Sequence, residues 1–226
     1  MSKQMKEVSL AATYTQRAEK GLRQRILDVL QVEDEVQRVS YKDFLAQIDE
    51  DTLAEWVNGE MIMTSPASRQ HQEIVRFLTI VFSTFVEQHA LGVVLPAPFQ
   101  MKLANSGREP DLLYLAEEHR ERLKTTYLDG RADLVVEIIS PESIGRDRGD
   151  KFYEYEQAGI PEYWLIDPQR ERAEFYQLDE RALYQLVPSD AEGVYHSAQL
   201  SGFAFPVDWL WSPPPVLDVL RYLNLI

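Results

Sequence analysis

The clearest pattern along the chain is an apolar stripe that recurs every three or four residues between positions 67 and 89. This spacing places the apolar side chains on one face of a helix. The stripe consists of Ile74, Phe77, Leu78, Val81, Phe82, Phe85 and Val86. Gly92 follows shortly afterwards, and glycine commonly stands just beyond the end of a helix. The pattern therefore predicts one long helix over residues 67–89.

Shorter helical patterns lie on both sides of this segment. Apolar residues at helical spacing predict an amphipathic helix over residues 14–31, outside the main core: Leu22, Ile26, Leu27 and Leu30. Ser40 is a good helix-capping residue and predicts a short helix that ends near residue 48. Further helices are expected over residues 117–127, 147–158 and 216–223.

Strand patterns occupy much of the remaining chain. Asn58-Gly59 is a strong two-residue turn signal and predicts a hairpin over residues 53–63. The run LVVEII at residues 134–139 is rich in β-favouring residues and predicts a central strand buried on both faces. Other strands are expected at 93–103, 111–115, 162–166, 173–178 and 182–187, with a polar loop over residues 105–109.

Long helices that alternate with buried strands indicate an α/β fold with a mixed central sheet. The chain has 226 residues, which suffices for one large domain or two small ones. We expect an N-terminal helical extension (1–38), a core (39–200) and an aromatic tail (201–226) that docks on the core. The tail carries Phe203, Phe205, Trp209 and Trp211.

Composition narrows the possible functions. With 23 basic and 37 acidic residues the formal net charge is −14, and there is no cysteine. A disulfide framework, a thiolate metal site and a cysteine nucleophile are therefore excluded, and a cytoplasmic location is expected. The longest apolar run, residues 77–86, is too short to span a membrane, so we expect no membrane association. Because nucleic acid is a polyanion, a net charge this negative also argues against nonspecific electrostatic binding to nucleic acid.

The candidate chemistry lies in carboxylates. The common nucleotide-binding, serine-hydrolase and zinc-protease motifs are absent from the sequence, and its four histidines are widely spaced. Asp111 begins a predicted strand, and Glu137 lies within the apolar run 134–139. A buried carboxylate needs a compensating partner, and two that converge would suit Mg²⁺ or Mn²⁺. The alternative is that Glu137 faces solvent on a half-exposed strand.

Lys151 follows Glu137 by 14 positions, on the predicted helix 147–158. Asp147 and Tyr155 lie one turn away on either side and share its face. Lys151 would stabilise charge on a reacting phosphate, and Tyr155 would position it. The alternative is an ordinary surface ion pair between Asp147 and Lys151.

Two residues near the start of the long helix are also candidates. His71 lies on the apolar stripe and points inward, either as a core histidine or as part of the site. Glu73 lies off the stripe, so we expect it to be solvated.

The order of the motifs resembles that of a known family. EWVNGEMIMTSPAS at residues 55–68, followed by His71 and Ile74, resembles the opening of the Uma-type family of restriction endonucleases. Three further segments look like its successive signatures: EPDLLY (109–114), LVVEIISPES (134–143) and DRGDK (147–151). Tyr155 and the segment GIPEYWLIDP (159–168) complete the series, so the resemblance covers roughly residues 40–180.

This resemblance implies membership of the PD-(D/E)xK nuclease superfamily. Its members share a restriction-endonuclease-like fold, in which helices flank a mixed sheet of four or five strands. Asp111 and Glu137 would then be the catalytic metal ligands. The superfamily lysine stands two positions after the second acid, where this chain has Ile139, and Lys151 matches variants in which the lysine has moved to the next helix.

The leading hypothesis is an endonuclease that hydrolyses phosphodiester bonds of DNA by a metal-activated water, with Mg²⁺ or Mn²⁺ as cofactor. Asp111, Glu137, Lys151, Tyr155 and His71 form its candidate catalytic set. The alternative is an inactive nuclease-fold module for binding or dimerisation. A glycosidase with Asp111 and Glu137 as its acid and base is a more distant alternative.

The distribution of charge is compatible with a nucleic-acid partner. Residues 102–151 hold nine basic and eleven acidic residues, a net charge of 9 − 11 = −2, while the rest of the chain carries −12. Two of those eleven acids are the candidate metal ligands. The amphipathic N-terminal segment and the aromatic tail further lead us to expect a homodimer.

Overall fold

The structure is a computed structural model that describes residues 38–48, 52, 54–63, 67–140 and 143–226. Two units are distinguished along the chain, residues 1–39 and 40–226. The fold below is that of the second unit. The helix predicted over residues 14–31 lies outside the described residues.

Six strands form the main sheet, in the order β11-β10-β9-β8-β6-β3. Strands β8 and β9 are parallel, and the other neighbours are antiparallel. The bounds are β3 Gly92–Pro96, β6 Leu112–Ala116, β8 Leu134–Ile138, β9 Glu162–Asp167, β10 Arg172–Leu178 and β11 Tyr184–Leu186. This mixed sheet confirms the predicted fold class, although it is larger than the four or five strands that the resemblance implied.

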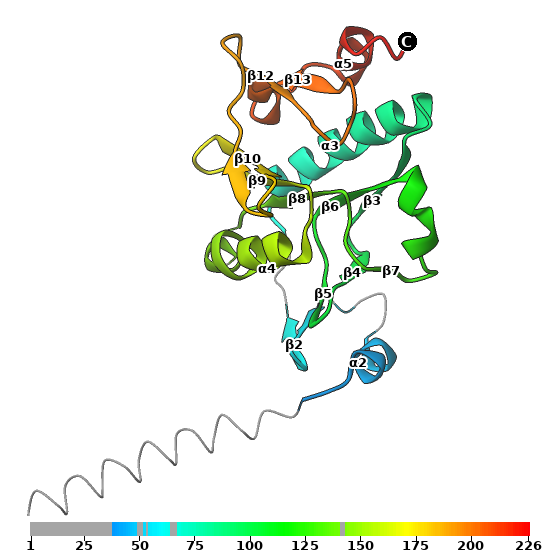
Figure 1. The fold of residues 1–226 in the computed structure, drawn as a ribbon. Helices are drawn as coiled ribbons and strands as arrows, with labels where there is room; N and C mark the ends of the chain where they lie inside the picture. The colour runs from blue at the N-terminus through cyan, green and yellow to red at the C-terminus, as the bar shows by residue number, and fades with distance from the viewer. Residues whose placement is uncertain (1–37, 49–51, 53, 64–66, 141–142) are drawn as a thin grey trace, which may run out of the picture. The chain divides into compact units, whose positions relative to one another are not determined.

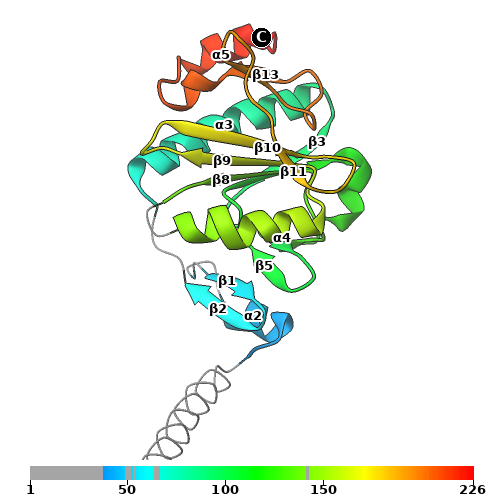
Figure 2. The same ribbon diagram turned by 60° about the vertical axis from the view of Figure 1, so that its left-hand side comes forward.

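Helices cover both faces of the main sheet (Figures 1 and 2). Helix α3 (Arg69–Gln88) lies on one face, and its buried side chains are those of the predicted stripe together with His71. On the other face η2 (Arg146–Asp150) forms a π-helical turn that continues directly into α4 (Lys151–Ala158). The helix ends at Gly159, whose φ of 74° is the left-handed conformation that favours glycine there.

Alternate residues of β8 face the two helices. Leu134, Val136 and Ile138 belong to the core cluster beneath α3. Val135 and Ile139 belong to the cluster beneath α4. Because side chains alternate along a strand, Glu137 lies on the α4 side. The alternation of side chains along β8 thus places the carboxylate of Glu137 on the side of the helix that carries Lys151.

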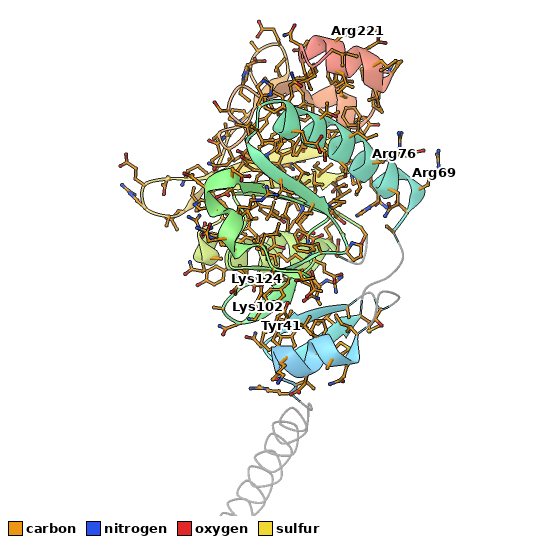
Figure 3. The ribbon with its side chains drawn as sticks, turned by 90° about the vertical axis from the view of Figure 1, so that its right-hand side faces the viewer. Tyr41, Arg69, Arg76, Lys102, Lys124 and Arg221 are labelled. Carbon is orange, nitrogen blue, oxygen red and sulfur yellow. The ribbon has the colours of Figure 1, made fainter. Side chains whose placement is uncertain are left out.

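A second sheet of five strands has the order β2-β1-β5-β4-β7. Its strands are β1 Ala54–Val57, β2 Glu60–Met63, β4 Gln100–Lys102, β5 Ser106–Arg108 and β7 Tyr127–Asp129. The hairpin predicted at Asn58-Gly59 is confirmed. Helix α2 (Tyr41–Gln47), capped by Ser40 as predicted, contacts this sheet, and Lys102 lies 4.9 Å from the ring centre of Tyr41 (Figure 3).

The structure corrects three expectations around this sheet. Residues 93–103 are not one strand, because they divide into β3 and β4 in different sheets. The predicted polar loop over residues 105–109 contains β5, whose polar side chains are buried among charged partners. The predicted helix over 117–127 is a 3₁₀ helix, η1 (Glu117–Arg122), followed by β7.

The chain from residue 194 onwards forms β12 (Val194–His196), β13 (Ala204–Pro206), η3 (Val207–Leu210) and α5 (Val216–Tyr222). Its aromatic side chains pack on α3 and β9: the ring centres of Phe203 and Phe82 are 5.1 Å apart, and Phe205 stacks on Trp164. The domain boundaries expected at residues 38 and 200 stay predictions. Among the described helices, none is both long and apolar enough to cross a membrane.

Candidate active site

Asp111 lies immediately before β6, at the edge of the main sheet where β8 ends. Its Oδ2 atom accepts a hydrogen bond of 2.7 Å from the backbone N–H of Ile138. The same oxygen lies 3.1 Å from Nε2 of His71 on α3. Asp111 therefore connects β6, β8 and the first turn of α3, and its side chain remains 19% exposed.

Glu137 is buried, with 3% of its surface exposed. The alternative that it faces solvent is therefore wrong. Both carboxylate oxygens lie 3.0 Å from Nζ of Lys151, and Oε1 accepts a 2.6 Å hydrogen bond from the hydroxyl of Tyr155. Glu137 is thus a buried carboxylate within an apolar run, and its two partners from α4 are Lys151 and Tyr155.

Lys151 is also buried, and it contacts three carboxylates. Besides Glu137, its Nζ lies 3.1 Å from Oε1 of Glu55 and 3.6 Å from Oδ1 of Asp147. Asp147 is 1% exposed. The alternative of a surface ion pair is wrong, since both partners lie inside the protein.

Glu55 also lies in the candidate site, although no sequence pattern indicated it. It lies on β1, in the smaller sheet, and is 2% exposed. Arg108 of β5 lies 3.1 Å from its Oε2, and the backbone N–H of Glu109 donates to its Oε1. Arg108 also binds Glu154 of α4 at 2.6 Å. Glu55 stood within the family-like opening segment, but a single acid in a short hairpin is an ordinary surface pattern.

Burial and the neighbouring charges together shift the pKa values of these groups in opposite directions. Burial raises the pKa of Glu137 to about 8, and the negative charges of Asp147, Asp111 and Glu55 add to this against the opposing effect of Lys151. Burial also raises the pKa of Asp147. A negative charge on either of these buried acids is therefore costly, and an added cation would lower that cost.

Two other groups shift toward the charged form. Burial opposes charge on Lys151, but the three surrounding carboxylates outweigh it and raise its pKa. Burial likewise acts to raise the pKa of Glu55, but Lys151 and Arg108 prevail and lower it. Lys151 and Glu55 are thus a firmly ionised pair at neutral pH.

The structure separates the two candidates on α3. His71 is buried and lies beside Asp111 in the candidate site, and its Nδ1 has no hydrogen-bond partner among the described residues. Glu73 forms an exposed ion pair with Arg69 at 2.8 Å. The expectation that Glu73 is solvated is confirmed.

The described side chains do not form a preassembled metal cage. Within the described parts of the chain, no three histidine or acidic side chains are grouped as ligands of one ion. The carboxylates surround the ammonium of Lys151 instead. The donor set nevertheless fits a hard divalent cation, since it consists of carboxylate oxygens, and no described residue donates a hydrogen bond to the buried Oδ1 of Asp147.

A family model described as "Putative restriction endonuclease", Uma2, matches residues 41–208. The chain belongs to this family. The Uma2 match spans the candidate site residues from Glu55 to Tyr155, and the resemblance seen in the sequence motifs is confirmed.

The fold of this chain is similar to that of a solved structure of another protein. It is described as a "putative nuclease" from Anabaena variabilis ATCC 29413, with a TM-score of 0.66 and 15% sequence identity. The match covers 77% of this chain and 98% of the other. At this identity the likeness establishes the fold. No curated protein matches the chain.

Proposed function

We propose that this chain is a metal-dependent endonuclease that hydrolyses phosphodiester bonds of DNA. The observation that carries the proposal is the buried cluster in which Lys151 of α4 meets Glu137 of β8, beside Asp111 at the end of the same sheet edge. Membership of the restriction-endonuclease family supports this reading of the cluster. The fold alone would not, because one fold hosts many functions.

Asp111 and Glu137 would hold Mg²⁺ or Mn²⁺ through carboxylate oxygens. When bound, such an ion supplies Lewis-acid polarisation of the phosphodiester and lowers the pKa of a water molecule. Hydrogen bonds to Asp111 involve its Oδ2 atom in the described residues, which leaves Oδ1 as the oxygen available to a ligand. The donor set favours these hard cations over zinc.

Tyr155 and His71 would position the metal ligands, and Lys151 would stabilise negative charge on the substrate. The Tyr155 hydroxyl donates to Glu137 and fixes the orientation of that carboxylate. His71 does the same for Asp111 from the opposite helix. Lys151 keeps a positive charge at the site, and a charge held in place stabilises the negative charge that develops on a reacting phosphate.

The inactive binding or dimerisation module remains the second candidate, and one observation favours it. Lys151 already contacts Glu55, Glu137 and Asp147. A protein that uses its lysine as a permanent counter-ion needs no metal for stability. The two candidates therefore differ in whether a divalent cation binds.

An activity assay distinguishes the two. Purified protein is incubated with single- and double-stranded DNA and RNA in Mg²⁺ or Mn²⁺, beside Asp111→Ala, Glu137→Ala and Lys151→Ala. The proposal expects cleavage of DNA by the wild type, loss of cleavage in all three variants, and normal cleavage by Glu73→Ala, an exposed carboxylate on α3. Cleavage that persists in the three site variants would remove the site assignment, and absence of cleavage would favour the module.

A thermal-shift measurement tests the metal separately from turnover. Mg²⁺ should raise the melting temperature of the wild type and leave that of Glu137→Gln unchanged. An equal shift in both proteins would contradict Glu137 as a ligand. The homodimer and the cytoplasmic location expected from the sequence stay proposals, and the former is tested by the mass of the protein in solution.

A further inference from the structure

A cluster of arginine side chains lies at the turn between β9 and β10, bound to two buried carboxylates. Arg170 lies 2.8 Å from Oδ2 of Asp167, and Arg172 lies 2.7 Å from Oε1 of Glu174. Arg148 of η2 contacts both acids, Glu174 through Nη1 and Asp167 through Nη2 at 4.0 Å. We call Arg148, Arg170 and Arg172 the arginine cluster.

The exposed part of this cluster is predominantly positive. The side chains of Asp167 and Glu174 are 2% and 6% exposed, whereas those of Arg170 and Arg172 are 61% and 60% exposed. The carboxylates therefore face the protein, and the guanidinium groups face the solvent. Glu171, at the turn, is the exposed acid between the two arginines and offsets part of their charge.

The arginine cluster lies on the same sheet edge as the candidate active site. Glu137 of β8 is paired with Leu165 of β9, and Asp167 stands two residues further along β9. With normal strand spacing, the Cα atoms of Glu137 and Asp167 are about 8 Å apart. Arg148 directly follows Asp147, whose carboxylate lies 3.6 Å from Lys151.

Other features converge on this edge. Figure 2 shows that α3 and α4 both begin on the side where β8 ends. The side chain of Gln70, in the first turn of α3, donates to the backbone oxygen of Pro168 just after β9. On η2, the buried Nε of Arg146 has no hydrogen-bond partner among the described residues. Within the described part of the chain, a donor without a partner thus lies two residues before Arg148.

We propose that the arginine cluster binds the phosphate backbone of the nucleic acid on which the site acts. The inference rests on the proposed function and adds to it the surface that receives the substrate. Guanidinium groups suit this role because their donors match phosphate oxygens in pairs. The buried carboxylates hold the arginines in place, which lowers the entropy lost on binding.

The charge of the whole chain makes such a local surface necessary. A net charge of −14 repels a polyanion, so binding needs a region where exposed cations exceed exposed acids. The arginine cluster meets this requirement. It also lies near the candidate site, since the Cα atoms of Glu137 and Asp167 are about 8 Å apart. Phosphate contacts position a nucleic acid without reading its sequence, so the surface predicts no base preference.

The test measures binding of a fluorescein-labelled DNA duplex by anisotropy in EDTA, over a range of salt concentrations. The test variant is Arg170→Gln/Arg172→Gln. The matched control is Arg120→Gln/Arg221→Gln, which removes two exposed arginines that also pair with nearby acids. Arg120 lies on η1, and Arg221 lies on α5, where Figure 3 labels it. Both variants change the net charge by the same amount, so a general charge effect cancels.

We expect the test variant to bind at least tenfold more weakly at low salt. The slope of log affinity against log salt should fall by about 1.8, because each lost phosphate contact removes about 0.9. The control variant should match the wild type, and Glu171→Gln should bind at least as tightly as the wild type. Circular dichroism checks that each variant is folded. Equal losses in the test and control variants would overturn the proposal, as would a wild type that binds no nucleic acid.

The outcomes separate this surface from the proposed hydrolysis. Binding through the arginine cluster without cleavage in Mg²⁺ or Mn²⁺ would refute the hydrolase and support the surface. Cleavage that is unaffected by Arg170→Gln/Arg172→Gln would support the hydrolase and refute the surface. The same assay with single-stranded DNA and RNA shows which nucleic acid the cluster binds, and an effect confined to RNA would refute DNA as the substrate.

Discussion

The ammonium group of Lys151 lies 3.0 Å from each carboxylate oxygen of Glu137, and both side chains are buried. The lysine reaches the acid across the space between α4 and β8. Its further contacts with Glu55 and Asp147 make it the cation shared by three carboxylates. The stability of the metal-free protein should therefore depend on this one ammonium.

Lys151→Met tests this dependence. Removing one partner of a buried ion pair typically costs about 3–5 kcal/mol, because the remaining charges lose their compensation. We expect urea denaturation in EDTA to show a loss of this size. Lys124→Met, which removes an exposed lysine, should change stability by less than about 0.5 kcal/mol. Equal stabilities of the two variants would show that the cluster does not need Lys151.

The raised pKa of Glu137 predicts a pH dependence in EDTA. The folded protein binds this proton more tightly than the unfolded chain, so its stabilising effect is complete below about 4.5 and is lost as the pH rises to about 8. The wild type should thus lose stability relative to Glu137→Gln across this range. Melting temperatures of both proteins at pH 5, 7 and 9 measure the difference, and a difference independent of pH would contradict the prediction.

Glu55 should contribute to metal binding as well as to stability. Glu55→Gln removes a charge that faces Lys151 and Arg108, and we expect a loss of about 1–3 kcal/mol in unfolding free energy. Glu154→Gln is the matched control, since Glu154 also binds Arg108. Calorimetric titration with Mn²⁺ should show weaker binding in Glu55→Gln alone. Equal weakening in both variants would assign Glu55 a purely structural role.

His71 should act through the orientation of Asp111. Partners that orient a metal ligand typically contribute 10- to 100-fold to metal affinity. We expect His71→Ala to weaken Mn²⁺ binding by roughly this factor, and His71→Gln to restore part of it, because a glutamine amide can still donate to Oδ2 of Asp111. If both variants bind Mn²⁺ like the wild type, His71 has no part in positioning Asp111.

Glu162 should affect the stability of the fold without affecting metal binding at the candidate site. Its fully buried carboxylate accepts hydrogen bonds from Trp164, Tyr195, Ser197, Ala198 and Gln199. In Glu162→Gln an amide group would face these donors, so we expect a loss of about 2–4 kcal/mol in stability. The melting-temperature shift caused by Mg²⁺ should persist. Its disappearance would mean that the site depends on the packing of the C-terminal segment.

Local sequence patterns determined most of the main elements. The apolar stripe of α3, the turn at Asn58-Gly59 and the β-favouring run of β8 each report an interaction within one element or a tight turn. The order of the motifs also identified Asp111, Glu137 and Lys151 as candidates. The stripe, the turn and the strand run share one property, which is that residues close together in the sequence carry the signal.

Tertiary structure decided what surrounds each candidate. Strand β5 reads as a polar loop because its charged side chain, Arg108, is balanced by Glu55 and Glu154 from distant parts of the chain. Glu55 could not be predicted for the same reason. An acid in a hairpin is expected to be solvated, and only the tertiary structure places Lys151 beside it. Periodicity shows which face of an element is buried. Only the packed fold shows which charges meet there, because the compensating partner lies far away in the sequence.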